Sequence, residues 1–265
     1  MPIYPPTGGK IYGDTKVYPP SGGKIYPGTV YPPSLNPNWP FTDIPLPPFL
    51  WRPDLTGDYR NVGGAGAVLN LMLAPGTPAP SFSDGCILSN PSGVCTVLLT
   101  PVNPNVSSLG AVWSWIFKGI IPVGGYITSF SNTNGDQSGG GDCYLNDGSP
   151  ISIDLYQDVN NSLIKQSTSS LQGGIEYTII LTFNNGDMHL YINGIEDILI
   201  DFGSNGTMTT MGDSIYGWVI GDDAAGASGY GWDPSTNGSL IQVEAIAKGV
   251  AYTPAQAAAI TAGLS

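Results

Sequence analysis

The chain of 265 residues is poor in charge: only 11% of its residues are Asp, Glu, Lys or Arg, against about 25% in ordinary soluble domains. Basic residues are scarcer than acidic ones: the chain has eight Lys and Arg and 20 Asp and Glu, which gives a formal net charge of −12. An acidic protein repels phosphate groups, so we expect no nucleic-acid partner. Histidine occurs once, as His189, and glutamate only at Glu176, Glu196 and Glu244, which leaves little material for acid–base catalysis.

Cysteines and long apolar runs are also scarce. The odd set of Cys86, Cys95 and Cys143, without a CxxC motif, leaves at least one thiol outside any disulfide within the chain. We expect unpaired, partly buried cysteines, typical of folding in a reducing cytoplasm, with a Cys86–Cys95 disulfide as the alternative. The first residues, MPIYPPTGG, lack the features of a signal peptide, and no apolar stretch approaches the roughly 18 residues of a membrane span. We therefore expect no membrane insertion.

Proline and glycine are abundant, and residues 1–53 hold most of the prolines in a near-repeat. YPPTGGKIY is followed by YPPSGGKIY and then by a third YPPS. Proline fixes the backbone and removes donors, so this segment is predicted to be extended. Each unit also carries an apolar residue followed by Tyr, which a solvated linker does not need and which suits docking on a partner. We predict an anchoring arm rather than a disordered tail, with these contact residues: Tyr4, Ile11, Tyr12, Tyr18, Ile25, Tyr26, Tyr31 and Trp39.

Residues 54–265 change to short apolar runs at regular spacing, separated by Gly, Asn, Asp or Pro, which is typical of an all-β sandwich or jelly roll. Asn185-Gly186 between two alternating runs is a strong signal for a tight hairpin. At the end of the chain, Thr253, Pro254 and Gln256 form a capping-box pattern, and Gly263 is a stop signal, so a short helix is predicted after the last strand. The strands are predicted at 94–100, 111–119, 124–132, 149–158, 162–170, 176–185, 187–194, 214–223 and 238–250.

One stretch of the body resembles a known family. GGIEYTIILTFNNGDMHLYINGIED (Gly173–Asp197) is similar to the signature hairpin of concanavalin A-like (LamG or pentraxin-type) jelly rolls. IYGWVIGDD resembles the family's glycine strand, and GSLIQVEAIAKGVAYTPAQAAAI resembles its closing strand and helix, although Gln242 and Ala245 replace charged positions. The resemblance covers roughly residues 90–265 and implies a concanavalin A-like jelly-roll sandwich. It does not select a function, because this fold hosts lectins, glycosidases and structural modules.

Catalytic residues are not evident. Glycosidases of this fold carry the strand motif E-x-D-x-x-E, and the nearest segment here is SIDLYQD, with Asp154 and Asp158 but no Glu. His189 lies in DMHLYIN, where Met188, Leu190 and Ile192 alternate inward, so His189 and Tyr191 are expected on the opposite, solvent-facing side of the strand. We therefore predict that the protein is not an enzyme.

The predicted glycan-binding residues lie in the glycine-rich loop ASGYGWDPSTNGS. They are Tyr230, Trp232, Asp233 and Asn237, an aromatic pair for stacking on a sugar with polar groups beside it. The alternative is that Trp232 packs over the end of the sandwich or against another subunit. No cofactor is expected. If calcium binds, the candidate ligands are Asp142, Asp147 and Asp222, although acidic turn residues ordinarily serve only to form turns.

Together these features predict a non-enzymatic virion structural protein, a bacteriophage-type capsid decoration (cement) or head-fibre protein. Its arm would dock on capsid or other virion proteins, and its lectin-like domain would project from the virion surface after assembly in the host cytoplasm. The alternative is a receptor-binding adhesin, a tail fibre or surface lectin that binds host polysaccharide through Tyr230 and Trp232. A homo-oligomer is expected in either case.

Overall fold

The chain forms two compact units, Met1–Thr42 and Asp43–Ser265. The computed structural model describes residues 37–88, 96–121, 150–158, 160–213, 217–221 and 240–264, and the backbone of 10–12, 16–18, 125–129 and 140–145. The second unit begins before the predicted boundary at residue 54. The reason is that the Pro-rich segment ends in a strand, β3 (Phe49–Trp51), which pairs antiparallel with β18 (Leu240–Lys248) and so belongs to the body.

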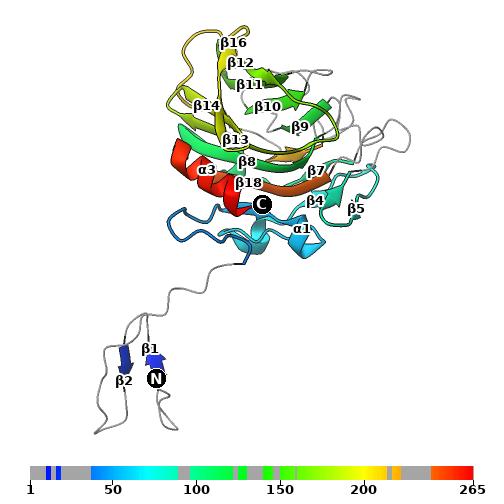
Figure 1. The fold of residues 1–265 in the computed structure, drawn as a ribbon, viewed down its shortest axis with the longest axis vertical. Coiled ribbons are helices and arrows are strands. Elements are labelled where there is room, and N and C mark those ends of the chain that lie inside the picture. The colour runs from blue at the N-terminus through cyan, green and yellow to red at the C-terminus, as the bar shows by residue number, and fades with distance from the viewer. Residues whose placement is uncertain are drawn as a thin grey trace. The chain divides into compact units, whose positions relative to one another are not determined.

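The body is an all-β sandwich of two antiparallel sheets (Figure 1). Sheet I contains, in spatial order, β16 (Leu199–Asp201), β12 (Asn161–Ser170), β11 (Pro150–Asp158), β10 (Gly140–Leu145), β9 (Gly125–Ser129), β17 (Val219–Ile220), β7 (Leu98–Leu99) and β4 (Met72–Leu73). Sheet II contains β15 (Ile195–Asp197), β14 (Asp187–Ile192), β13 (Glu176–Asn184), β8 (Val112–Ile120), β18, β6 (Cys86–Ile87) and β5 (Ser81–Phe82), with β3 also paired to β18.

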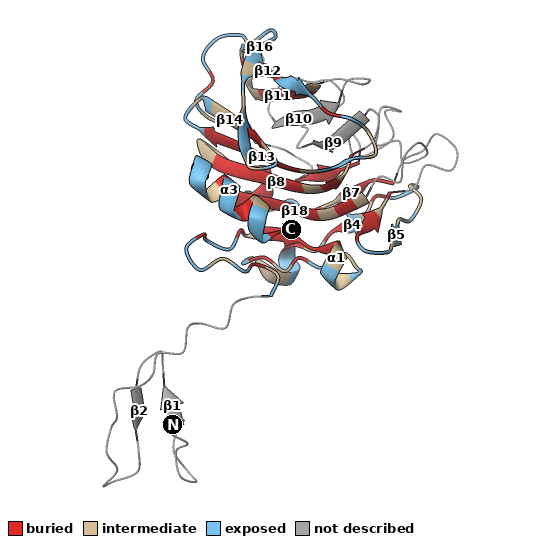
Figure 2. Cartoon of the chain, in the orientation of Figure 1, coloured by how far each residue is buried: buried red, intermediate tan, exposed pale blue. Residues whose placement is uncertain are grey.

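The core lies between the two sheets because their strands alternate apolar residues inward. On β8, Trp113, Trp115 and Phe117 are at most 1% exposed and belong to one core cluster with Ile153 of β11 and Trp218. Trp113, Trp115 and Trp218 are therefore all core residues. Figure 2 shows the buried residues concentrated along β13, β8 and β18. Full burial of a large apolar side chain contributes about 1.5–3 kcal/mol, so these central strands supply much of the fold's stability.

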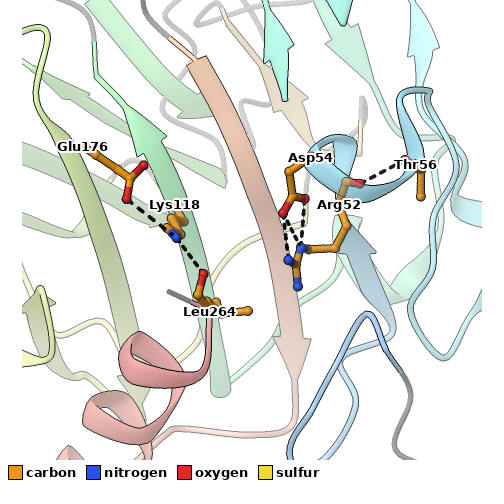
Figure 3. Close-up of polar contacts among 6 residues, drawn as sticks. All are labelled: Arg52, Asp54, Thr56, Lys118, Glu176 and Leu264. Carbon is orange, nitrogen blue, oxygen red and sulfur yellow. Dashed lines mark hydrogen bonds and ion pairs between the residues drawn. The ribbon is translucent and has the colours of Figure 1, made fainter. Parts of the chain in front are cut away.

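The predicted C-terminal helix is present as α3 (Pro254–Gly263). Thr253 and Gln256 form both hydrogen bonds of a capping box. Gly263 is the last helical residue rather than the stop, because the backbone continues in helical geometry at Leu264. The helix lies outside sheet II, where the Lys118 ammonium donates to the Leu264 carbonyl at 2.6 Å and pairs with Glu176 at 3.6 Å (Figure 3).

Three shorter helical turns occur in connections: α1 (Pro53–Thr56), η1 (Gly66–Leu69) and α2 (Pro104–Ser107). The α1 turn is fixed by Arg52, which is 7% exposed and pairs with Asp54 through two nitrogens, while the Thr56 hydroxyl donates to the Arg52 carbonyl at 3.0 Å (Figure 3). A two-pronged arginine–carboxylate pair is geometrically specific, so it holds the corner between β3 and the rest of the chain. In the described part of the chain, no helix is long and apolar enough to cross a bilayer.

The hairpin predicted at Asn185-Gly186 is confirmed. Both residues have positive φ, 51° and 93°, as a type I′ turn requires, and β13 pairs with β14 across it. A second Asn-Gly pair, Asn193-Gly194, has the same geometry, with φ of 51° and 79°, and joins β14 to β15. The sequence NNGDMHLYING therefore encodes two successive tight turns.

Two features of the body differ from the sequence-based expectations. The sequence predicts no strand at Asp142, a candidate calcium ligand, but residues 140–145 form β10, held on both sides by β9 and β11. Tyr191 shares a face with His189, against which its ring stacks, but it is only 2% exposed rather than solvent-facing. Cys86 is a free, buried thiol whose pKa is raised by burial, as expected for an unreactive core cysteine.

Candidate functional site

The residues of the predicted glycan loop lie outside the described residues. Tyr230, Trp232, Asp233 and Asn237 fall between β17 and β18, so their binding role stays a prediction. The same holds for the calcium candidates Asp147 and Asp222. Among the described residues, no three His, Cys, Asp or Glu side chains are grouped so as to hold a metal ion.

The predicted anchoring residues are only partly described. Tyr4, Ile25, Tyr26 and Tyr31 lie outside the described residues. Ile11 and Tyr12 lie in β1 (Lys10–Tyr12) and Tyr18 lies in β2 (Lys16–Tyr18), two antiparallel strands in which Ile11 is opposite Val17.

Trp39, the last of the predicted anchors, is only 2% exposed, and its ring meets the Phe41 ring edge-on at 4.8 Å. A ring buried to this extent within its own chain leaves little surface for a partner.

Asp154 is a described carboxyl with an unusual setting outside the core. On β11, Ile151, Ile153 and Leu155 are buried in the core, so alternation places Asp154 on the outer face of sheet I. In the sheet register Asp154 lies between Ile164 of β12 and Asp142 of β10. In the sequence, Asp154 stands out only as part of the nearest approach to a glycosidase motif.

The electrostatics of Asp154 are unusual for a residue outside the core. Its side chain is half-buried, and its Oδ1 atom has no hydrogen-bond partner among the described residues. Desolvation raises the pKa of this carboxyl to about 6, and a hydrogen bond from Tyr156 lowers it only in part. Strongly perturbed acids of this kind are enriched at functional sites, because folding by itself does not favour a desolvated charge.

Polar groups surround Asp154 on the same face. Ser152 lies one step along β11, and its hydroxyl accepts a hydrogen bond from the Gln166 amide of β12 at 3.3 Å. Tyr156 lies one step in the other direction and is also half-buried. An aspartate, a phenol and an amide that are each partly exposed on one face can together bind a ligand rich in hydroxyl groups, whereas the Ser152 hydroxyl is buried and orients the Gln166 amide. We name Ser152, Asp154, Tyr156 and Gln166 the Asp154 face.

A second polar cluster lies on β14 and β15, around the single histidine. The Nδ1 atom of His189 lies 2.6 Å from the Glu196 carboxylate and its Nε2 atom lies 3.0 Å from Asp187. The side chain is 39% exposed, in agreement with the predicted solvent-facing histidine, and its ring stacks on Tyr191 at 6.5 Å. Exposed ion pairs of this kind contribute little to stability, so we interpret the cluster as a surface feature of the sheet.

The pKa of His189 is expected to lie above its ordinary value of 6.5. The hydrogen bond to Glu196 is the largest cause, followed among the raising effects by the hydrogen bond to Asp187. An NMR titration of the one histidine should therefore show a raised pKa, lowered more by Glu196→Gln than by Asp187→Asn. A titration that neither variant moves would contradict the described geometry.

A third carboxyl, Glu244 of β18, lies inside the core. It is 0% exposed, and its Oε1 atom accepts hydrogen bonds from the indole N–H groups of Trp115 at 2.5 Å and Trp218 at 3.0 Å. Trp115 belongs to sheet II, whereas Trp218 precedes β17: its carbonyl accepts from the Thr100 backbone N–H and its own N–H donates to the Thr100 hydroxyl, just after β7. Glu244 therefore links the two sheets through the core. With no route to solvent, we interpret it as structural.

Comparison with known proteins supports the fold. No protein-family model matches the chain, and no curated protein sequence matches it. Among solved structures, a chain of botulinum neurotoxin type C superimposes with a TM-score of 0.55 at 14% identity, over 82% of this chain and 51% of the toxin chain. The binding domain of serotype D gives 0.51 at 17% identity, over 82% and 52%. The fold is a lectin-like β-sandwich.

An enzyme also shares the sandwich. A Trypanosoma rangeli sialidase, in complex with 2,3-difluorosialic acid, gives a TM-score of 0.53 at 10% identity, over 80% of this chain and 32% of the sialidase chain. This chain therefore spans about half of the toxin chains and a third of the enzyme. At these identities the likeness concerns the fold and not the activity.

Proposed function

We propose that the lectin-like sandwich is a non-enzymatic carbohydrate-binding module and that its binding surface includes the Asp154 face. The observation that carries the proposal is the half-buried carboxyl with one oxygen lacking a partner among the described residues. A buried acceptor without a donor costs about 1–3 kcal/mol, and a sugar hydroxyl would remove that cost. The predicted loop at Tyr230 and Trp232 stays a second candidate contact.

The solved structures with a similar fold support a binding role. The cell entry of botulinum neurotoxin type C depends on its interaction with two ganglioside molecules. The same fold can serve different functions, so this likeness supports carbohydrate binding in general and does not name the sugar. Of the two functions predicted from the sequence, it favours the receptor-binding adhesin.

Charge argues for a neutral glycan. The chain carries a net charge of −12, and Asp154 is ionised above its pKa of about 6. A carboxylate in a partly desolvated site repels another anion but accepts hydrogen bonds from neutral hydroxyl groups. We therefore propose neutral polysaccharides as the ligand class, in contrast to sialylated glycans.

The test is glycan-array binding of the full chain, with glucans, galactans and mannans as the neutral set and gangliosides as the sialylated set. Asp154→Asn should weaken binding to the neutral set at least about tenfold, or roughly 1.4 kcal/mol. Asp158→Asn is the matched control, because it is the same substitution on the same strand at a carboxyl that already accepts hydrogen bonds from Asn160 and Asn161, and it should leave binding unchanged. Binding to gangliosides alone, or equal binding by both variants, would overturn the proposal.

Hydrolysis is tested in the same samples. Asp142 lies opposite Asp154 in the register of β10 and β11, and a retaining glycosidase needs two carboxyls about 5–5.5 Å apart. We expect no new reducing ends after prolonged incubation of the wild-type protein with each bound polysaccharide. Their release, lost in Asp154→Asn, would contradict the non-enzymatic assignment.

We further propose that the N-terminal repeats attach the sandwich to a larger particle, with a virion surface as the favoured location. The support is the repeated apolar-Tyr pair in a segment rich in proline, which loses little entropy on docking. Deleting residues 1–34 should abolish attachment to particles while circular dichroism and thermal unfolding of the body stay unchanged, since Asp43–Ser265 is a compact unit of its own. Normal attachment of the truncated protein would show that the arm is not the anchor.

A further inference from the structure

One edge of sheet I is formed by β16, at the upper end of the sheet in Figure 1, and the other by β4. Around this strand three large apolar side chains are exposed: Ile198 at 71%, Ile200 at 46% and Phe202 at 65%. They alternate with Leu199, which packs against the core, and Asp201, which pairs with Lys165 at 2.8 Å. Edge strands of monomers ordinarily carry charges or prolines that block pairing, and here the outer row is entirely apolar.

The backbone of β16 is also available for pairing. Phe202 donates to the Ile164 carbonyl at 2.9 Å, Thr168 donates to the Ile198 carbonyl at 3.0 Å, and Ile200 lies opposite Gln166. Residues 198, 200 and 202 therefore direct their backbone groups toward β12. Alternation in an antiparallel pair turns the N–H and C=O groups of Leu199 and Asp201 to the free edge, where no other strand pairs among the described residues.

We propose that two copies of this chain associate edge to edge through β16, as an antiparallel pair with its two-fold axis at Ile200. In this register each Leu199 faces Asp201 of the second copy, and the two pairs exchange their free N–H and C=O groups in four hydrogen bonds. Ile200 meets its own equivalent, and each Ile198 meets Phe202, so six apolar side chains form one row. The two Asp201 carboxylates are not opposed, which avoids the like-charge pairing that would block such a contact.

The proposed dimer determines how the two Asp154 faces are oriented relative to each other. The dimer itself does not depend on the proposed carbohydrate binding. A two-fold axis at the shared edge runs perpendicular to the joined sheet, so the outer faces of both copies point the same way. Ile200, Gln166 and Asp154 lie on that face, as their register shows. A dimer would present two Asp154 faces side by side, which favours binding to a repetitive surface through higher effective concentration.

The experiment is sedimentation or light scattering of the full chain over about 1–100 µM, a range that covers a small, weak interface. The wild type is expected to approach twice the monomer mass of 27.6 kDa with increasing concentration. Ile200→Lys, which places two like charges at the axis, should raise the dissociation constant at least about tenfold. Val68→Lys, at a 60% exposed residue of η1, is the matched control and should dimerise as the wild type does.

Hydrogen exchange of the wild type provides a measurement that needs no variant. The amides of Leu199 and Asp201 should become protected as concentration rises, whereas the amide of Ile200, already bonded to β12, should change little. A protein that stays monomeric throughout, a dimer unaffected by Ile200→Lys, or a dimer lost on deleting residues 1–34 would each overturn the proposal.

Discussion

Replacing Glu244 with alanine should lower the free energy of unfolding by about 2–5 kcal/mol, because each of two buried indole N–H groups loses its acceptor at a cost of about 1–3 kcal/mol. The variant leaves the indole N–H groups of Trp115 and Trp218 without an acceptor in the core and opens a cavity where the side chain was. Denaturant unfolding followed by circular dichroism measures the loss. Because Glu244 connects the sheets, we also expect the unfolding transition to broaden.

Two variants set the scale of this effect. Glu244→Gln keeps an accepting oxygen for both indoles and should cost clearly less than Glu244→Ala. Glu176→Ala removes a half-exposed glutamate whose contact with Lys118 is 3.6 Å long, and exposed pairs contribute about 0–1 kcal/mol. A loss below about 1 kcal/mol for Glu244→Ala would contradict the structural role assigned to this residue.

Replacing Asp154 with asparagine should stabilise the folded protein at pH 7 by about 1–2 kcal/mol. The pKa rise from 3.8 to about 6 corresponds to roughly 3 kcal/mol at full value, and partial exposure to solvent reduces it. Because the folded-state pKa is raised, the folded protein holds this proton more tightly than the unfolded chain. The stability that Asp154 contributes is thus fully present below about pH 4 and is lost as the pH rises through about 6.

The difference between two pH profiles isolates this residue from the other carboxyls. Unfolding free energies of wild type and Asp154→Asn, measured from pH 3.5 to 8, should diverge between about pH 4 and 6 and stay parallel above that range. The carbohydrate affinity of the wild type should follow the opposite trend and rise with ionisation of Asp154. A difference that does not change with pH would show that Asp154 is not desolvated. A residue that lowers stability while improving binding is the usual mark of a functional site.

Much of the fold could be predicted from local signals. The Asn185-Gly186 turn and the cap at Thr253 have geometries set by neighbouring residues, so the sequence alone located both. The strand β3 was missed because its stability comes from pairing with β18, far along the chain, which overrides the local proline content. The strand β10 was missed for the same reason: glycines disfavour an isolated strand, yet β9 and β11 hold it from both sides.

The candidate site was less predictable than the fold. Alternation in PISIDLYQD was sufficient to place Asp154 on the outer face, but the burial that raises its pKa depends on tertiary packing, which one sequence does not display. Glu244 carried a signal that could have been used. It is a lone acid in the apolar strand LIQVEAIAK, and such an acid requires buried donors, which tryptophan can supply.

The position of β18 has a consequence for how the protein is made. This strand pairs with β8 on one side and with β3 and β6 on the other, so it completes the middle of sheet II. It is synthesised about 120 residues after β8, and pairings across such distances form slowly. Until β18 leaves the ribosome, the edge of β8 opposite β13 has no native partner, and the nascent chain must be kept from aggregating until β18 has been synthesised.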